Sequence, residues 1–258
     1  MLETIRNKKA FICDMDGVIY HGTRLLDGAR QFVDWLKREQ KECLFLTNSS
    51  ERSPADLRAK LGGMGIDIDE SHFMTSALAT ATFLRTQKPN ARVYAIGGKG
   101  LSQALSEVGC VLTDHQPDYV VLGETAAYNY DKLETAILAV HGGARLIGTN
   151  PDICGPSEKG IVPACGAMIA PVELVTGRKA YFIGKPNPLI MRHSLKRLRC
   201  RREEAVIIGD RMDTDIIAGI ESEIQTVLVL SGITGKDDIE HFPYRPSLVL
   251  DRIGQIAK

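Results

Sequence analysis

Short, continuously apolar runs recur along the chain, separated by longer segments with helical periodicity. Examples of the runs are AFIC, CLFLT, YVVLGE and AVIIGD. A run that is apolar throughout, rather than at alternate positions, is typical of a strand buried on both faces. In the segments 27–40 and 186–200, apolar residues fall three or four positions apart, as in a helix with one buried side. This alternation predicts an α/β fold with a Rossmann-like parallel-sheet core covered by helices on both faces.

The composition argues against several kinds of partner. Lysine plus arginine and aspartate plus glutamate number 32 each, so no field of one sign favours a nucleic acid or an anionic membrane. No apolar run approaches the ~20 residues of a membrane-spanning helix, and the first residues lack the apolar stretch of a signal peptide. The six cysteines form no CxxC pair, which suits free thiols in a reducing compartment. We therefore expect a cytoplasmic protein.

Charged and polar residues gather where several of the apolar runs end. Because the carboxyl ends of parallel strands meet at one edge of a sheet, these residues are expected to lie close together. They are Asp14 and Asp16 after the first run, Thr47, Asn48 and Ser49 after the second, Lys185 after AYFIG, and Asp210 and Asp215 after AVIIG.

The runs in the middle of the chain end differently, in Gly97-Gly98, Gly123-Glu124 and Thr149-Asn150. They carry neither an aspartate pair nor a matching lysine. This asymmetry predicts two units. The core domain would comprise residues 1–79 and 180–258, and residues 80–179 would form a smaller inserted α/β domain.

Carboxylates converging on one sheet edge repel one another unless positive charge joins them. Lys185 supplies one positive charge, and a divalent cation would supply two. Carboxylate oxygens without a histidine or cysteine cluster indicate Mg²⁺. Short donors at Thr47 and Asn48, together with turn amides, would suit a phosphoryl group. Asp14 and Asp16 are two positions apart, so in a strand they share a face, where one could attack phosphorus while the other handles a proton.

Four motifs in order resemble those of the haloacid dehalogenase-like hydrolase superfamily. They are DMDGV, LTNSS, GKPNP and GDRMDTDI. The segment between the second and third motifs is similar to the type II cap of the NagD-like phosphatases, class IIA, on the basis of GETAAYNYDKLETA, GTNPD and PACGA. The resemblance covers almost the whole chain, and the four motifs together are far more specific than DxDG alone.

The resemblance implies roles for the residues that match the motifs. Asp14 resembles the nucleophile that forms an aspartyl-phosphate. Asp16 resembles the general acid and base, and its backbone carbonyl a metal ligand. Lys185 resembles the lysine that holds the nucleophile and the phosphoryl oxygens. The remaining implied roles are phosphate binding by Thr47 and Asn48, direct metal ligation by Asp210, and orientation of metal-bound water by Asp215.

Other residues are open to two interpretations. Ser49 and Asn150 are candidates for substrate binding, although Asn150 would alternatively fix the geometry of the NPD turn. Glu124 presents the same choice. Asp213 either caps the helix expected at TDIIAGI or takes part in catalysis. His21 either touches substrate or lies on the surface.

The predicted function is a Mg²⁺-dependent phosphatase that hydrolyses small phosphorylated metabolites, such as nucleoside monophosphates or sugar phosphates. One alternative is a phosphomutase of the same fold, which returns the phosphoryl group to its substrate. Another is a non-catalytic regulator that binds a phosphometabolite, although crowded carboxylates bring little to a mere binder. A dehalogenase is disfavoured, because its chemistry needs no general acid at the position of Asp16. We also expect a homodimer or higher homo-oligomer to be feasible through the cap surfaces.

Overall fold

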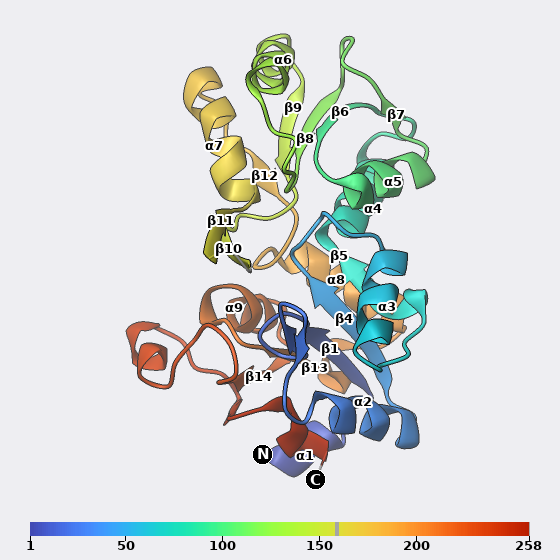
Figure 1. Ribbon diagram of the computed structural model, residues 1–258, viewed down its shortest axis with the longest axis vertical. Helices are drawn as coiled ribbons and strands as arrows, with labels where there is room; N and C mark the ends of the chain where they lie inside the picture. The colour runs from blue at the N-terminus through green and yellow to red at the C-terminus, as the bar shows by residue number, and fades with distance from the viewer. Residues whose placement is uncertain (158–159, 258) are drawn as a thin grey trace. The chain divides into compact units, whose positions relative to one another are not determined.

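A computed structural model describes residues 1–157 and 160–257 and divides the chain into two compact units (Figure 1). The first unit comprises Met1–Thr47, Leu57–Met74 and Lys185–Lys258. The second comprises Asn48–Asp56 and Thr75–Gly184. Each unit is built around its own sheet, and each is described by itself below.

The first unit contains a six-stranded sheet in the order β15-β14-β13-β1-β4-β5. Neighbouring strands from β15 to β4 run parallel. The strand bounds are β1 Ala10–Asp14, β4 Glu42–Thr47, β5 Phe73–Thr75, β13 Ala205–Gly209, β14 Gln225–Val229 and β15 Leu248–Leu250. β1 is buried along its length until Asp14, as its continuously apolar sequence predicts.

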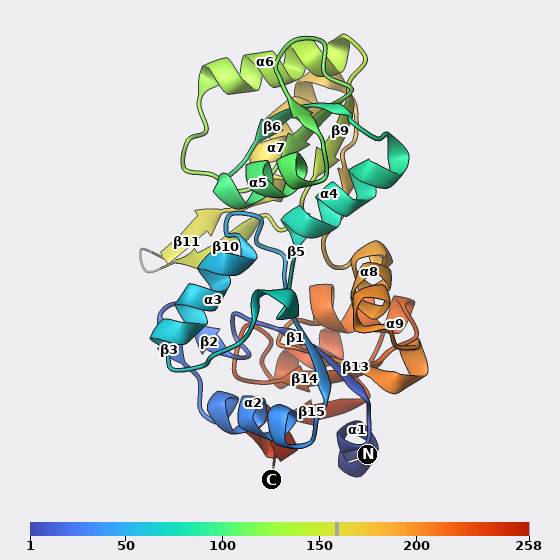
Figure 2. The ribbon, with the colours of Figure 1, turned by 90° about the vertical axis from the view of Figure 1, so that its right-hand side faces the viewer.

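Helices cover both faces of this sheet (Figure 2). On one face, the side chains of α2 and α3 pack with alternate residues of the central strands, among them Phe11 and Phe45. On the other face, α8 packs on β4 and α9 on β14. The helix bounds are α1 Leu2–Arg6, α2 Ala29–Arg38, α3 Pro54–Gly63, α8 Pro188–Leu198 and α9 Ile217–Glu221.

The start of α8 has a local explanation in the sequence. The Asn187 side chain accepts a hydrogen bond from the Leu189 backbone N–H at 2.9 Å, and Pro188 occupies the first helical turn. An asparagine cap followed by proline is a favoured helix start, because the cap satisfies a free N–H and proline needs none. Lys185 is thereby placed immediately before a well-defined helix.

The second unit contains a five-stranded parallel sheet in the order β12-β9-β8-β6-β7. α6 and α7 form an apolar cluster with one face of β8 and β9. Figure 1 shows α4 and α5 on the other side of this sheet. The bounds are α4 Ser76–Gln87, β6 Arg92–Ile96, α5 Lys99–Glu107, β7 Val111–Leu112, β8 Tyr119–Leu122, α6 Tyr130–His141, β9 Arg145–Gly148, α7 Cys165–Thr176 and β12 Tyr181–Phe182.

Two antiparallel strand pairs complete the described strands. β2 Tyr20–His21 pairs with β3 Arg24–Leu25 in the first unit, and β10 Cys154–Ser157 with β11 Gly160–Pro163 in the second. Among the described residues, no helix combines the length and the apolar character needed to cross a membrane.

The structure confirms the α/β class with two parallel sheets but differs from the predicted division at 79 and 180. The first boundary falls inside α4, whose residues continue without interruption. The run AYFIG was expected in the core sheet, but β12 pairs with β9 of the second unit. The segment Asn48–Asp56, which was expected in the core domain, also belongs to the second unit. The first unit therefore contains fewer residues than the predicted core domain.

A close backbone contact in the first unit gives a stability prediction. Gly28 precedes α2 with φ +83°, and a Cβ there would lie 2.6 Å from the Gly254 Cα. Gly22 also has a positive φ, +59°, but nothing lies within 4 Å of its Cβ position. Both alanine variants carry the cost of a left-handed backbone, and only Gly28→Ala adds a steric clash. We expect Gly28→Ala to lower the free energy of unfolding by at least about 1 kcal/mol more than Gly22→Ala.

Urea denaturation of both variants measures this difference. Equal losses of stability would show that the chain relaxes around Gly28 at no cost.

Candidate active site

The first strand delivers Asp14 to the edge of the sheet. The chain then turns sharply, because Gly17 adopts φ +79° and its N–H donates to the Tyr20 carbonyl at 2.8 Å. A left-handed backbone at this point favours glycine. The Ser231 hydroxyl donates to the Gly17 carbonyl at 2.7 Å and so fastens the turn to the chain that follows β14.

Lys185 forms the central contact of the site. Its Nζ lies 2.6 Å from Asp14 Oδ1 and 2.7 Å from Asp215 Oδ1. The lysine is only 2% exposed and Asp215 is fully buried. Charge-assisted hydrogen bonds of this length in a buried setting are strong, so they hold the Asp14 carboxylate in a fixed place.

Asp210 follows β13 and is fixed from the loop after β14. Its Oδ2 accepts from the Ile233 N–H at 2.8 Å, and its own carbonyl accepts from the Thr234 N–H at 3.1 Å. A Cβ at Gly232 would stand 2.0 Å from Asp210 Oδ2, and one at Gly17 would stand 2.5 Å from it. Both glycines are therefore needed for the carboxylate to occupy this position.

Asp215 comes from the turn that begins α9. Asp215 lies in the π-helical segment Met212–Ile216, and its Oδ2 accepts a hydrogen bond from the Arg211 N–H at 3.2 Å. The Asp215 side chain also packs against Gly209, where a Cβ would stand 2.1 Å from its Cγ. The glycine that ends β13 thus leaves room for the carboxylate that binds Lys185.

The three aspartates form a set that fits a divalent cation. One carboxylate oxygen from each of Asp14, Asp210 and Asp215 lies within 4.8 Å of the others. With Lys185 the group carries three negative charges and one positive charge when ionised, a net charge of −2. Three hard oxygen donors with this surplus match the preferences of a divalent cation such as Mg²⁺ or Ca²⁺.

The charged groups of the cluster shift one another's pKa values. Burial, together with Asp215 and Asp210, raises the pKa of Asp14 well above its usual value, although Lys185 opposes the shift. Burial and Asp215 raise the pKa of Asp210 to about 6. Burial alone would lower the pKa of Lys185, but Asp14 and Asp215 outweigh it and raise that pKa. The lysine therefore stays charged at neutral pH, and a bound cation would favour the ionised forms of Asp14 and Asp210.

Asp16 lies outside this buried set. Its side chain is 44% exposed, and its Oδ1 is 3.4 Å from His21 Nδ1. His21 is itself exposed, as the surface interpretation expected, and its contact with Asp16 lies at the surface. Asp14 and Asp16 therefore occupy unlike surroundings, although they are two residues apart.

The other candidates are distributed over both units. Thr47 ends β4 in the first unit, whereas Asn48, Ser49 and Asn150 belong to the second. Asn150 is fully buried, and its Nδ2 donates to the Asn48 carbonyl at 2.7 Å. This contact favours the alternative in which Asn150 fixes the NPD turn over direct contact with substrate.

Asp213 pairs with a neighbouring arginine at the start of the helix. Its carboxylate forms a bidentate ion pair with Arg211, with Oδ1 2.9 Å from Nε and Oδ2 2.7 Å from Nη2. Within the described part of the chain, the segment Met212–Ile216 begins at Arg211 without a side-chain cap, so the structure gives no support to the cap interpretation of Asp213.

Sequence reasoning missed the residues that shape the site without carrying charge. Gly232 and Ile233 lie in SGIT, directly after the strand TVLVL, and they surround Asp210. The signal in the sequence was an apolar run that, like the runs before the charged residues, ends in a glycine-containing turn.

Family models match both ends of the chain. A model described as "Haloacid dehalogenase-like hydrolase" matches residues 11–111, and a HAD-hydrolase-like model matches residues 182–256. The dihydroxyacetone phosphatase of Corynebacterium glutamicum is 44% identical over 96% of this chain and 90% of its own length. The chain belongs to the haloacid dehalogenase-like hydrolases.

Two further proteins place it among the NagD-like members, as the motifs predicted. The ribonucleotide monophosphatase NagD of Escherichia coli is 40% identical over 98% of both chains. The solved structure of a 4-nitrophenylphosphatase from Thermotoga maritima matches with a TM-score of 0.94 at 33% identity, over 98% of both chains. The chain is accordingly a phosphoric monoester hydrolase of this family.

The space around Asp210 gives a prediction about metal binding. Gly232→Ala places a methyl group against the Asp210 carboxylate, whereas at Gly235, three residues later, the nearest atom is 3.1 Å from the Cβ position. We expect Gly232→Ala to weaken Mg²⁺ binding at least about tenfold, because a misplaced ligand loses its charge-assisted contact. Isothermal titration of the folded variants with Mg²⁺ measures this. Gly235→Ala should match the parent, and equal affinities in all three proteins would contradict a ligand role for Asp210.

The raised pKa of Asp210 predicts a pH-dependent effect of metal on stability. The unfolded carboxyl titrates near 3.8 and the folded, metal-free one at about 6. The folded chain thus holds an extra proton between these values, and the metal-free fold loses stability as pH rises through this window. A cation requires ionised ligands, so it should raise the melting temperature more at about pH 7.5 than at about pH 5.

Thermal unfolding with and without excess MgCl₂ at both pH values checks this. An equal rise of the melting temperature at both pH values would show that metal binding does not depend on the titration of Asp210.

Proposed function

We propose that the chain is a Mg²⁺-dependent phosphatase that hydrolyses small organic phosphate monoesters through an aspartyl-phosphate on Asp14. The observation that supports this is the double contact of the buried Lys185 ammonium with Asp14 and Asp215, beside Asp210. This arrangement fixes one carboxylate as a nucleophile and leaves negative charge for a cation to balance. It is suited to covalent phosphoryl transfer.

In the first half of the reaction, an Asp14 carboxylate oxygen attacks phosphorus. A bond forms between this oxygen and phosphorus, and the bond from phosphorus to the ester oxygen breaks. Asp16 gives its proton to the departing oxygen, so the alcohol leaves neutral. Lys185 holds Asp14 in place and offsets the charge on the phosphoryl oxygens.

In the second half, Asp16 is a carboxylate and accepts a proton from water. The water oxygen attacks phosphorus, and the bond to Asp14 breaks. Inorganic phosphate leaves, and both aspartates return to their starting states. The exposed position of Asp16, in contrast to Asp14, is consistent with a group that exchanges protons with substrate and water.

The proposed metal ligands are Asp14 and Asp210, with the Asp16 backbone carbonyl as a further oxygen, and Asp215 would orient water on the bound ion. The bound ion would neutralise charge on the carboxylates and on the transferring phosphoryl group. Mg²⁺ is preferred because the donors are hard oxygens, and the cluster includes neither histidine nor cysteine.

The proposed substrates are small phosphorylated metabolites, either sugar phosphates or nucleoside monophosphates. The names of the relatives from C. glutamicum and E. coli, a dihydroxyacetone phosphatase and a ribonucleotide monophosphatase, support this range. Thr47 and Asn48, with Ser49, are proposed to bind the phosphoryl group. The cytoplasmic location and the homo-oligomer stay predictions.

A panel of phosphate esters tests the proposed function. Purified protein with Mg²⁺ is incubated with p-nitrophenyl phosphate, triose and hexose phosphates and nucleoside monophosphates, and free phosphate is measured. We expect phosphate release from several of them, with kcat/KM ranking the class. Isomerised phosphate ester without free phosphate would indicate a mutase instead, and binding without turnover would indicate a regulator.

The nucleophile gives the sharpest mutational prediction. Asp14→Asn keeps the shape of the side chain but removes the attacking charge, so we expect kcat to fall by about 1,000-fold or more. Asp213→Asn is the matched control, because Asp213 pairs with Arg211 rather than with the cluster. It should keep kcat within about threefold of the parent. Both variants should retain the circular dichroism of the parent, and parental turnover in Asp14→Asn would remove Asp14 as the nucleophile.

A further inference from the structure

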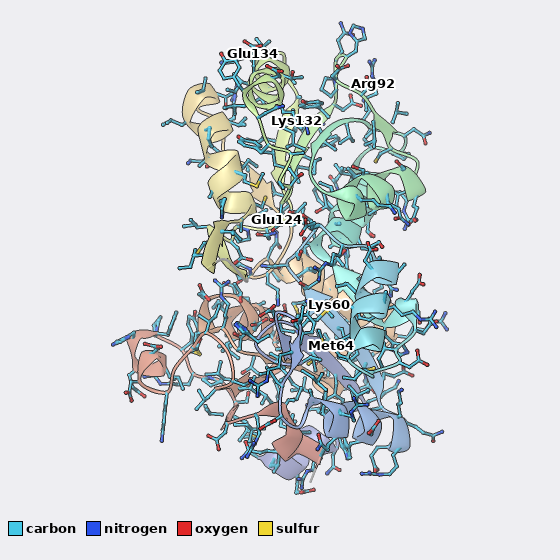
Figure 3. All side chains as sticks on the ribbon, in the orientation of Figure 1. Lys60, Met64, Arg92, Glu124, Lys132 and Glu134 are labelled. Carbon is cyan, nitrogen blue, oxygen red and sulfur yellow. The ribbon has the colours of Figure 1, made fainter. Side chains whose placement is uncertain are left out.

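The segment Asn48–Ser50 is held by side chains that follow two strands of the second unit. Glu124 comes two residues after β8, and Asn150 two residues after β9. Figure 3 shows Glu124 just beyond the end of β8. Ser50 and Asn150 are fully buried, and Glu124 is half-buried. A carboxylate and an amide at neighbouring strand ends therefore meet the chain that follows Thr47.

Glu124 accepts from three donors of this region. Its Oε2 accepts from the Ser50 N–H at 3.0 Å and from the Ser50 hydroxyl, and its Oε1 accepts from Asn150 Nδ2. The Ser50 hydroxyl in turn accepts from Thr149 Oγ1 at 3.2 Å. All three partners of the carboxylate are donors, so only a side chain with two acceptor oxygens satisfies them together.

Asn48 is fixed at both its backbone and its side chain. Its carbonyl accepts from Asn150 Nδ2 at 2.7 Å and from Ser76 Oγ at 2.5 Å. Its Nδ2 donates to Asp152 Oδ2 at 2.9 Å. Asn150 Oδ1 accepts from the Asp152 N–H at 3.1 Å, which sets the amide so that Nδ2 faces Asn48 and Glu124. The network therefore determines where the Asn48 side chain points.

Glycines let the segment approach the sheet closely. A Cβ at Gly123 would stand 2.3 Å from Ser50 Oγ, and one at Gly184 would stand 2.7 Å from Asn48 Oδ1. A Cβ at Gly100 would stand 2.6 Å from the backbone of Arg52, the second residue beyond Ser50. The segment is thus seated against the second unit by shape as well as by hydrogen bonds.

We propose that Glu124 is a positioning residue for phosphate binding: through Ser50 and Asn150, its carboxylate sets the main chain that presents Asn48. This inference rests on the proposed function, in which Asn48 binds the phosphoryl group. Both Glu124 oxygens already accept from protein donors, which favours this role over contact with a leaving group. A negative charge weakens the binding of an anion. The Glu124 carboxylate beside this segment is therefore explained by the hydrogen bonds that it accepts rather than by its charge.

Glu124→Gln tests the proposal with little change of shape. The amide nitrogen faces either Ser50 or Asn150, both donors, so one of the present hydrogen bonds is lost whichever way it turns. The readouts are KM and kcat for p-nitrophenyl phosphate and for one nucleoside monophosphate, and the inhibition constant of inorganic phosphate. We expect both KM values and the phosphate inhibition constant to rise together, about tenfold. The ratio of kcat/KM between the two esters should stay within about twofold.

Glu51→Gln is the matched control. Glu51 is exposed and directly follows the segment, and its replacement by glutamine removes the same charge without breaking the network. It should leave KM unchanged or slightly lower. Ser50→Ala is a milder second variant, which keeps the Ser50 N–H bond to Glu124 and should shift the same constants by a smaller factor.

Each outcome decides between positioning and its rivals. Tighter phosphate inhibition in Glu124→Gln would show that the residue acts through charge, and a change in one ester alone would show that it reads the leaving group. A lower kcat with unchanged KM and a lower melting temperature would show a structural role only. Any of these results overturns the proposal. The unmodified enzyme distinguishes failure of this inference from failure of the proposed function. If the unmodified enzyme hydrolyses none of the esters, the proposed function is wrong.

Discussion

The buried Lys185 ammonium is the interaction on which the rest of the site depends. Three carboxylates whose oxygens lie within 4.8 Å of one another are unfavourable in a protein interior. Lys185 offsets one of the three charges and orients two of the groups, Asp14 and Asp215, by direct hydrogen bonds. A buried pair of this kind adds little net stability, and breaking it would leave an uncompensated charge. Its value is therefore geometric: it fixes the Asp14 carboxylate, the proposed nucleophile, beside a site with two surplus negative charges when all three carboxylates are ionised.

The parallel sheet explains how distant parts of the chain supply this cluster. β1 pairs with β13 and β4 in a register that sets Cys13 beside Ile208 and Asp14 beside Leu46. The strands consequently end at one edge, where Asp14, Asp210 and Thr47 follow or complete them. Glycines at this edge then decide which side chains have space, and the absence of a side chain at Gly17 and Gly232 leaves room for the Asp210 carboxylate.

The part of the LTNSS motif that follows Thr47 obeys a different constraint. From Asn48 onward the chain is anchored in the second unit by Glu124, Asn150 and Ser76, all of which lie at or near strand or helix ends. The motif LTNSS is thus divided between two structural units, after Thr47. The Asp14 carboxylate, the proposed nucleophile, and the Asn48 amide, proposed to bind the phosphoryl group, are therefore fixed by separate hydrogen-bond networks.

Sequence patterns predicted the sheet and the charged residues well, because both signals are local. A continuously apolar run marks a buried strand, and Asp14, Lys185, Asp210 and Asp215 stand directly at or after such runs or in the turn that follows. The unit boundaries were not predictable in this way, since α4 continues across residue 79 with no change in its pattern. β12 is only two residues long, so its partner depends on tertiary packing rather than on its own sequence. The positions of Gly232 and Glu124 follow from contacts with residues far along the chain, which no local pattern contains.

A crystal structure of the protein grown with Mg²⁺ tests the central claim most directly. The account predicts one cation coordinated by Asp14 and Asp210, with Lys185 Nζ still within hydrogen-bond distance of both Asp14 and Asp215. A cation bound elsewhere, or a Lys185 side chain that points away from these two carboxylates, would contradict it.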